Sequence, residues 1–293
     1  MKRSVNSKFT FAISMAVFGT IGVFVRYIPL PSGEIALYRA LLALVIVGAY
    51  LLISKQRMAL YEAKKEIALL LLSGAAMGFN WIFLFEAYKY TTVSVATLSY
   101  YFAPVIVTVL SPILFKEKMT LKKAICFVFS SVGLVLLTGI GNMSGQESNL
   151  KGIGFGIGAA CLYATVMLLN KAIKGISGIY RTFLQFASAA AVLIPYVLLS
   201  EGINIISLRT DGLICLLTVG VIHTGITYLL YFSSLKEIEG QQAAVLSYID
   251  PLIAVVVSVF ILKEEITAVQ IIGGALILIF TLLNEISFKR IKK

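Results

Sequence analysis

The sequence predicts an all-α integral membrane protein with ten transmembrane helices, arranged as two inverted five-helix repeats. Three observations lead to this fold class: an apolar composition, ten long apolar runs, and a motif that recurs in each half. Of the 293 residues, 59% are hydrophobic and only 13% are charged, and the mean hydropathy is +0.95. Soluble domains carry about 25% charged residues, so the composition excludes an ordinary soluble fold.

Ten apolar runs supply the predicted spans. Each can cross a hydrocarbon layer of roughly 30 Å at about 1.5 Å per residue. Lipid offers the backbone no hydrogen bonds, and continuous apolar runs lack the alternation of barrel strands, so we expect α-helices. The runs are Phe9–Val25, Ile35–Ile53, Ile67–Tyr88, Val93–Phe115, Ala124–Ile140, Ile153–Leu169, Thr182–Leu199, Leu213–Ser233, Gln242–Leu262 and Val269–Ile286.

Topology, rather than nucleic-acid binding, explains the net charge of +11. If the N-terminus is cytoplasmic, most of the 25 Lys and Arg residues fall on the cytoplasmic side, as the positive-inside rule requires. An even number of spans then places both termini in the cytoplasm. No organelle-targeting segment is found and the first run reads as an uncleaved span, so we expect a multi-pass protein of a bacterial-type plasma membrane.

An internal repeat divides the chain into residues 1–145 and 146–293. PVIVTVLSPILFKEKMT, from Pro104, aligns without a gap with PLIAVVVSVFILKEEIT, from Pro251, and shares Pro, Ile, Val, Ser, Lys, Glu and Thr. Because five spans are an odd number, the second half enters the membrane from the opposite side. Inverted repeats are typical of secondary transporters, with the binding site at mid-membrane between the halves; a duplicated scaffold without transport is the alternative.

Pro104 and Pro251 lie near the midpoints of the fourth and ninth runs. A proline inside a helix removes its own N–H and frees the carbonyl four residues earlier. A free carbonyl is tolerated at this depth only where protein or a cavity covers it. Since the prolines recur at matching places, we expect gating hinges beside a cavity rather than simple packing kinks.

Polar residues deep in a span are costly and therefore mark candidate functional sites. Asp250 and His223, the only histidine, are predicted at similar depths on neighbouring spans, where they form either a proton site or a structural hydrogen bond. Arg39, near the end of its span, is explained by snorkelling to the interface. The predicted cavity residues are Asn80, Trp81, Tyr100, Tyr101, Tyr163, His223, Tyr228, Ser247 and Tyr248.

No phosphate loop, metal-ligand spacing or nucleophile with its base is found, and a lone histidine argues against a catalytic triad. We therefore expect no enzymatic activity, no metal and no cofactor. The expected partners are a small-molecule substrate and the lipid bilayer, without nucleic acid, and a homodimer stays open. A passive channel or facilitator and a non-transporting membrane sensor or scaffold are the alternatives to a transporter.

Three segments resemble the drug/metabolite transporter superfamily, EamA type: EIALYRALLALVIV from Glu34, EAYKYTTVSVATLSYYFAPVIVTVLSPILFKEKMT from Glu86, and LSYIDPLIAVVVSVFILKEEITAVQIIGGALIL from Leu246. That family has an Arg early in span 2, a mid-span Pro in the fourth helix of each half, a Glu after that helix and a Gly-rich fifth helix. The matching residues are Arg39, Pro104, Pro251, Glu117, Glu264, Gly133, Gly273 and Gly274. Asp250 fits the acid that often precedes the second proline.

The resemblance covers nearly the whole chain. It implies structural roles for Arg39, Glu117 and Glu264, a central cavity lined by spans 1, 3, 4, 6, 8 and 9, and peripheral spans 5 and 10. The expected function is a secondary active transporter that exports small organic metabolites, such as amino acids, by alternating access. Asp250 and His223 are the expected proton-coupling residues.

Overall fold

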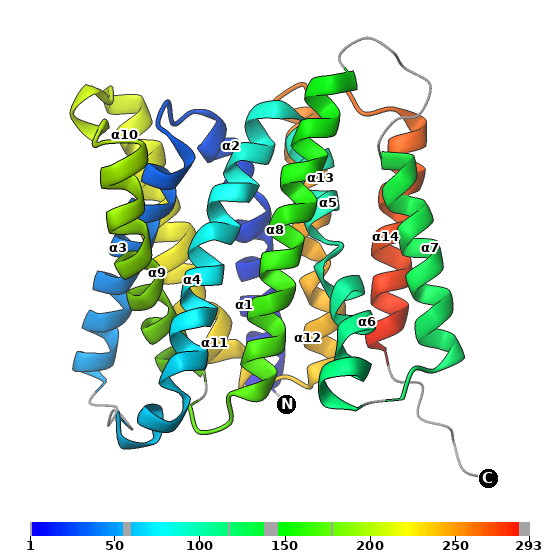
Figure 1. Cartoon of the computed structure of the whole chain (residues 1–293), viewed down its shortest axis with the longest axis horizontal. Helices are drawn as coiled ribbons and strands as arrows, with labels where there is room; N and C mark the ends of the chain where they lie inside the picture. The colour runs from blue at the N-terminus through cyan, green and yellow to red at the C-terminus, as the bar shows by residue number, and fades with distance from the viewer. Residues whose placement is uncertain (1, 55–59, 117, 138–145, 177, 287–293) are drawn as a thin grey trace.

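The computed structural model describes residues 2–54, 60–116, 118–137, 146–176 and 178–286, and every regular element within them is helical (Figure 1). Glu117, one of the family-pattern residues, lies outside the described residues. The elements are α1 (Lys2–Gly19), α2 (Ile21–Arg26), α3 (Ser32–Ile53), α4 (Leu60–Tyr90), α5 (Val93–Tyr100), α6 (Ala103–Phe115), α7 (Leu121–Leu137), α8 (Gln146–Ala172), α9 (Gly178–Ser200), η1 (Ile205–Ser207), α10 (Thr210–Leu217), η2 (Thr218–Ile226), α11 (Thr227–Leu235), α12 (Gly240–Ser247), α13 (Ile249–Phe260) and α14 (Ala268–Glu285).

Within the described residues, eight helical segments are long and apolar enough to cross a membrane, which confirms a multi-pass helical membrane protein. They coincide with eight of the predicted runs. The predicted fifth run falls on α7, of which the described part ends at Leu137, and the ninth is divided between α12 and α13. The eight segments are Asn6–Arg26, Ser32–Ile53, Glu66–Tyr90, Val93–Phe115, Glu147–Ala172, Gly178–Ser200, Thr210–Leu235 and Ala268–Glu285.

The helices lie side by side with their axes roughly along one direction (Figure 1). The start of α1 and the end of α14 lie at the same end of the bundle, here called the termini end, and the opposite end is called the far end. α4 packs against α8 and α9, α3 packs against α9 and η2, and α1 packs against α11 and α13. α7 and α14 form a pair at one side of the molecule.

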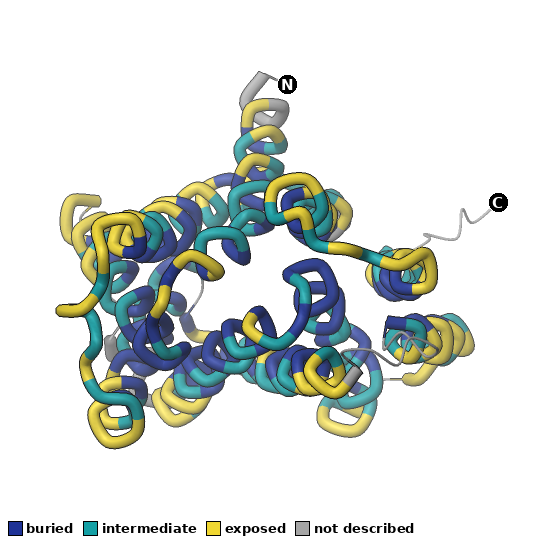
Figure 2. The backbone as a smooth tube through the Cα atoms, turned by 90° about the horizontal axis from the view of Figure 1, so that it is seen from above, coloured by how far each residue is buried: buried dark blue, intermediate teal, exposed yellow. Residues whose placement is uncertain are grey.

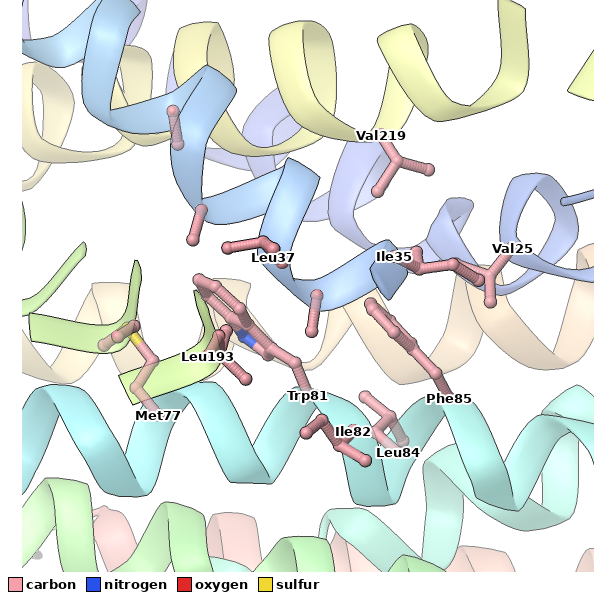
Figure 3. Close-up of a cluster of buried hydrophobic side chains, with 14 of the residues drawn as sticks. Val25, Ile35, Leu37, Met77, Trp81, Ile82, Leu84, Phe85, Leu193 and Val219 are labelled. Atoms are coloured by element: carbon pink, nitrogen blue, oxygen red, sulfur yellow. The ribbon is translucent and has the colours of Figure 1, made fainter. Parts of the chain in front are cut away.

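The largest buried cluster joins α2, α3, α4, α9 and η2. Figure 3 shows Trp81 and Phe85 of α4 pointing toward α3, with Leu193 of α9 and Val219 of η2 in the same cluster. Inside a bilayer such packing gains dispersion contacts rather than removing apolar surface from water. The cluster fixes the position of α3 against α4, and this contact forms one wall of the site described below.

Buried carboxylates tie the loops to helix ends. At the far end, Glu34 is fully buried and accepts hydrogen bonds from the backbone N–H groups of Asn204 and Ile205. Glu201 in turn accepts from the backbone N–H groups of Gly33 and Glu34, at the start of α3. These N–H groups have no partner within their own helix, so the carboxylates satisfy them and hold the first turn of α3 against the loop after α9.

A matching arrangement holds the termini end. Glu66 accepts from the backbone N–H groups of Lys174 and Gly175, in the loop between α8 and α9. Arg181 donates to the carbonyls of Asn170 and Ile173, near the C-terminal end of α8. The guanidinium satisfies carbonyls that a helix end leaves free.

Gly133 of α7 and Gly273 of α14 allow the closest approach of two backbones in this pair. A Cβ atom on either glycine would lie 2.6 Å from the carbonyl oxygen of the other. Because backbone atoms cannot move aside as a flexible side chain can, no larger residue fits without separating the helices. Small residues at such contacts are typical of membrane helix pairs.

We therefore expect Gly273→Val to lower the free energy of unfolding by about 1–3 kcal/mol through overpacking. Thermal unfolding of the detergent-solubilised protein measures the change. Gly154→Val is the matched control, because a Cβ atom at Gly154 meets no atom within 4 Å. Equal melting temperatures for the two variants would contradict this account of the α7–α14 contact.

Candidate functional site

A cavity of about 430 Å³ lies among the helices. Figure 2, seen along the bundle, shows the helices that surround it. The volume falls within the range of roughly 300–1,000 Å³ that small-molecule sites occupy. Glu285, an exposed residue that ends α14, belongs to its lining, as does buried Tyr88 toward the far end of α4. The lining therefore extends from near the far end of α4 to the termini end.

The lining contains most of the predicted cavity residues, brought together from both halves of the chain. They come from α4, the α5–α6 break, α8, α11 and the α12–α13 break. These residues are Asn80, Trp81, Tyr100, Tyr101, Tyr163, Tyr228, Ser247 and Tyr248; the predicted hinge Pro104 and the predicted coupling residue Asp250 also line the cavity.

Aromatic rings form much of the wall. The ring centroids of Tyr100 and Tyr163 lie 5.1 Å apart, and those of Tyr101 and Tyr248 lie 6.4 Å apart. Phe18 of α1 meets Tyr228 edge-on at 5.2 Å. A wall of tyrosines offers apolar faces together with hydroxyl groups, which suits a solute that is partly apolar and partly polar.

Two helices break beside the cavity, each just before its predicted hinge proline. α5 ends at Tyr100 and α6 begins at Ala103, so that Pro104 lies in the first turn of α6 and lines the cavity. α12 and α13 meet at Tyr248, and Pro251 lies in the first turn of α13 but outside the lining. A proline is well tolerated in a first turn, where its missing N–H would be unpaired anyway.

Asp250 lies in the first turn of α13, directly after the second break. Its carboxylate accepts a hydrogen bond of 2.7 Å from the hydroxyl of Tyr101. Within the described residues no Lys, Arg or His side chain pairs with it. The N-terminal end of a helix favours a negative charge, so the break places the carboxylate where the backbone itself can stabilise it.

Within the described residues no hydrogen bond or ion pair joins His223 to Asp250, contrary to the predicted pairing. Its ring is 2% exposed, lies outside the cavity lining, and contacts the hydroxyl of Thr20 at 2.9 Å and the carbonyl of Thr218 at 3.1 Å. The placement of His223 in the cavity is therefore wrong. The hydrogen bond predicted for the His223–Asp250 pair is not found either, because His223 bonds to Thr20 and Asp250 bonds to Tyr101.

Arg39 is a cavity residue that snorkelling failed to explain. Its side chain is buried at 5% exposure and lines the cavity. The guanidinium carbon lies 4.3 Å from the ring centroid of Trp81, and Nε donates a 2.7 Å hydrogen bond to the hydroxyl of Thr224. Snorkelling would carry the guanidinium out to water, whereas here it points inward. An arginine several residues inside an uncharged run was the sequence signal for this role.

The π-helical segment η2 positions Thr224 for this contact. The hydroxyls of Thr224 and Thr227 donate to carbonyls five residues earlier, in place of the four-residue spacing seen at Ser99. Cβ atoms added at Gly220 and Gly225 would clash with side chains of α3. The two glycines thus let η2 approach α3, and π-helical segments are frequent at functional sites.

Polar lining residues also join the helices around the cavity. Gln185 donates to the hydroxyl of Ser73 and to the side-chain carbonyl of Asn170 at 2.8 Å. Asn80, which was predicted, donates to the backbone carbonyl of Ala159 at 2.6 Å. Asn80 and Gln185 therefore hold α4, α8 and α9 together while bordering the cavity.

Glu264 closes the far end. Its carboxylate accepts from the backbone N–H of Val93 at 2.8 Å, from the hydroxyl of Ser258 and from Arg26. These contacts join α2, the start of α5 and the end of α13 in one cluster. Arg26 also donates to the carbonyl of Thr91, so the far-end cluster, here Arg26, Thr91, Val93, Ser258 and Glu264, seals the bundle beyond the cavity.

Comparison with known proteins gives one family. The model of the EamA-like transporter family matches residues 7–139 and 150–285. The uncharacterized transporter YxxF of Bacillus subtilis (strain 168) is 33% identical over 83% of this chain and 78% of its own. An uncharacterized transporter of Archaeoglobus fulgidus is 31% identical over 66% of this chain and 67% of its own.

Among solved structures, one crystal structure aligns over 95% of this chain and 96% of its own, with a TM-score of 0.63. At 14% sequence identity it shows a shared fold alone. The two family matches cover both halves, and the relatives are named as transporters. This multi-pass membrane protein with a central cavity therefore belongs to the EamA-like transporter family, and it is a membrane transporter.

Proposed function

We propose that the protein is a secondary active transporter that exports small organic metabolites, such as amino acids, by alternating access. The observation that carries the proposal is a cavity of about 430 Å³ that reaches the termini end and whose lining contains no residue of the hydrogen-bonded far-end cluster. A passive channel needs a continuous polar path through the bilayer, and the hydrogen-bonded far-end cluster interrupts it. A scaffold or sensor has no need of a cavity lined by buried charge.

We propose further that ten spans form two inverted repeats, divided near residue 145. α1 runs from the termini end and α8 runs from the far end, which supports inversion (Figure 1). In the proposed repeat α1 corresponds to α8, α3 to α9, and α4 to the segment formed by η2 and α11. Under this correspondence the α4–α8 contact matches the α11–α1 contact, and the α3–η2 contact matches the α9–α4 contact. Lys116 and Lys263, which follow α6 and α13, have positive φ angles of 55° and 57°, a conformation uncommon for lysine.

In the proposed cycle both termini lie in the cytoplasm of a plasma membrane, so the structure corresponds to the state that loads substrate from inside. The breaks at Pro104 and Pro251 act as hinges. Release to the outside requires the far-end cluster to separate while the termini end closes around α1, α8 and α12.

Asp250 is the proposed coupling residue. A carboxylate inside a membrane is costly when charged and uncompensated, and this one has a single hydroxyl donor and no cationic partner among the described residues. Protonation removes that cost. A proton taken up from one side and released to the other would thereby change the relative stability of the two states of the cycle.

The first prediction concerns the cavity. Ser247→Trp should reduce flux of any accepted metabolite to background, because the larger side chain fills the space that the solute needs. Counterflow in proteoliposomes against a metabolite library measures this. Cys161→Trp is the control, since Cys161 is exposed on α8 and outside the lining. Unchanged flux in Ser247→Trp would refute transport through this cavity.

The second prediction concerns coupling. Asp250→Asn should abolish uptake driven by a pH gradient while counterflow without a gradient continues, because the amide cannot carry a proton. The measurement is made between about pH 5.5 and 8, where a buried carboxylate can change its protonation. Asp211→Asn, which removes an exposed carboxylate outside the cavity lining, is the matched control. Gradient-driven uptake that survives in Asp250→Asn would eliminate Asp250 as the coupling residue.

A further inference from the structure

We propose that Arg39, stacked on Trp81 and held by Thr224, forms an anion subsite at the inner end of the cavity and takes the carboxylate of the transported solute. The proposal rests on the proposed transport function, because only that function makes the bound molecule a transported substrate. Under this proposal a transported solute must carry one carboxylate group, a requirement that the shape of the cavity alone does not specify.

The first support is an uncompensated charge. The guanidinium of Arg39 is buried, and within the described residues no Asp or Glu side chain lies within ion-pair distance of it. A buried charge without a counter-ion is costly. Thr224 and the faces of Trp81 and Phe85 recover part of this cost, and a bound anion would supply the rest.

The second support is the direction of the free donors. Nε is occupied by Thr224, whereas neither terminal nitrogen of the guanidinium has a hydrogen-bond partner within the described residues. Arginine presents its donors as a planar fork that matches a carboxylate. Nε is bonded to Thr224 of η2, and one face of the guanidinium packs against Trp81. The two terminal nitrogens therefore remain available to bind a ligand in the cavity.

The third support is the charge balance of the lining. Arg39 is the only Lys, Arg or His among the described lining residues, and Asp250 and Glu285 are the only acids. A phosphate carries more negative charge than one guanidinium can balance, and clusters of cations are the usual solution for it. A single carboxylate matches a single arginine. Asp250 remains available for a positively charged group on the same solute, since Tyr101 is its only hydrogen-bond partner among the described residues.

Trp81 makes the subsite directly observable. It is the only tryptophan in the chain, and the guanidinium lies against its ring. An anion that binds Arg39 changes the field and the packing at the indole, and therefore its fluorescence. The intrinsic emission of the full-length protein in detergent thus reports on this one place and requires no labelled ligand and no transport.

The experiment titrates the purified protein with hexanoate and leucine, and with hexanamide and leucinamide, in which a neutral carboxamide replaces the carboxylate, at constant ionic strength. We expect saturable changes in Trp81 fluorescence with the two carboxylates and none with the two carboxamides. Arg39→Gln should weaken carboxylate binding by about tenfold or more, as for the loss of a charged hydrogen bond. Arg209→Gln, which removes an exposed arginine outside the cavity, should bind as the wild type does.

Two further variants separate binding from folding. Arg39→Lys keeps the charge without the fork and should bind carboxylates more weakly than the wild type but better than Arg39→Gln. Thr224→Val should weaken hexanoate binding, and Thr224→Ser, which restores the hydroxyl, should recover it. If Arg39→Gln does not fold, the wild-type comparison of carboxylates with carboxamides decides by itself.

The subsite is refuted if carboxamides bind as tightly as carboxylates, if neither carboxylate gives a saturable change, or if folded Arg39→Gln binds carboxylates like the wild type. Saturable binding of inorganic phosphate in preference to carboxylates would also overturn the assigned class. Binding without flux would reject the proposed transport and leave the anion subsite intact. Flux that ignores the carboxylate would retain transport and reject the subsite.

Discussion

A backbone inside a bilayer must pair its own N–H and C=O groups or face a sheltered interior, because lipid offers no hydrogen bonds. In this protein the α-helical pattern lapses at Thr20, at Tyr101–Phe102, at Tyr248 and through η2. Gly19, Tyr101 and Tyr248 line the cavity, and η2 holds Arg39 there through Thr224. The cavity and the interrupted helices therefore depend on one another: the interior shelters the breaks, and the breaks supply its polar groups.

The same constraint separates two kinds of buried charge. Glu34 and Glu264 are surrounded by backbone N–H groups and side-chain donors, and they hold helix ends together. Arg39 and Asp250 have one hydrogen bond each and face a cavity. Satisfied charges stabilise one arrangement of helices, whereas partly satisfied charges leave capacity for a ligand or a proton. A transporter needs both, because the ends must hold and the centre must respond.

The two ends of the bundle are built unequally around this centre. Beyond the cavity, the far-end cluster joins α2, α5 and α13 through a single carboxylate. At the termini end the lining reaches the last residue of α14. One carboxylate thus joins three helix ends.

The sequence by itself identified the eight described segments that are long and apolar enough to cross a membrane, and the places where two of the predicted runs break. Hydropathy is summed locally over about 20 residues, and a proline acts on its own helix, so neither property needs the rest of the fold. Depth along each run also identified part of the lining, including Tyr100, Tyr163 and Asp250.

Only the tertiary structure decided which face of each helix meets the cavity. His223 was predicted inside and lies outside, while Arg39 was predicted at the interface and lies inside. Depth gives the position of a residue along the helix axis, but the direction of its side chain around that axis depends on packing. For His223 and Thr224 that direction also depends on the π-helical register of η2, which packs against α3. Those contacts join residues far apart in the chain, and no local pattern in the sequence encodes them.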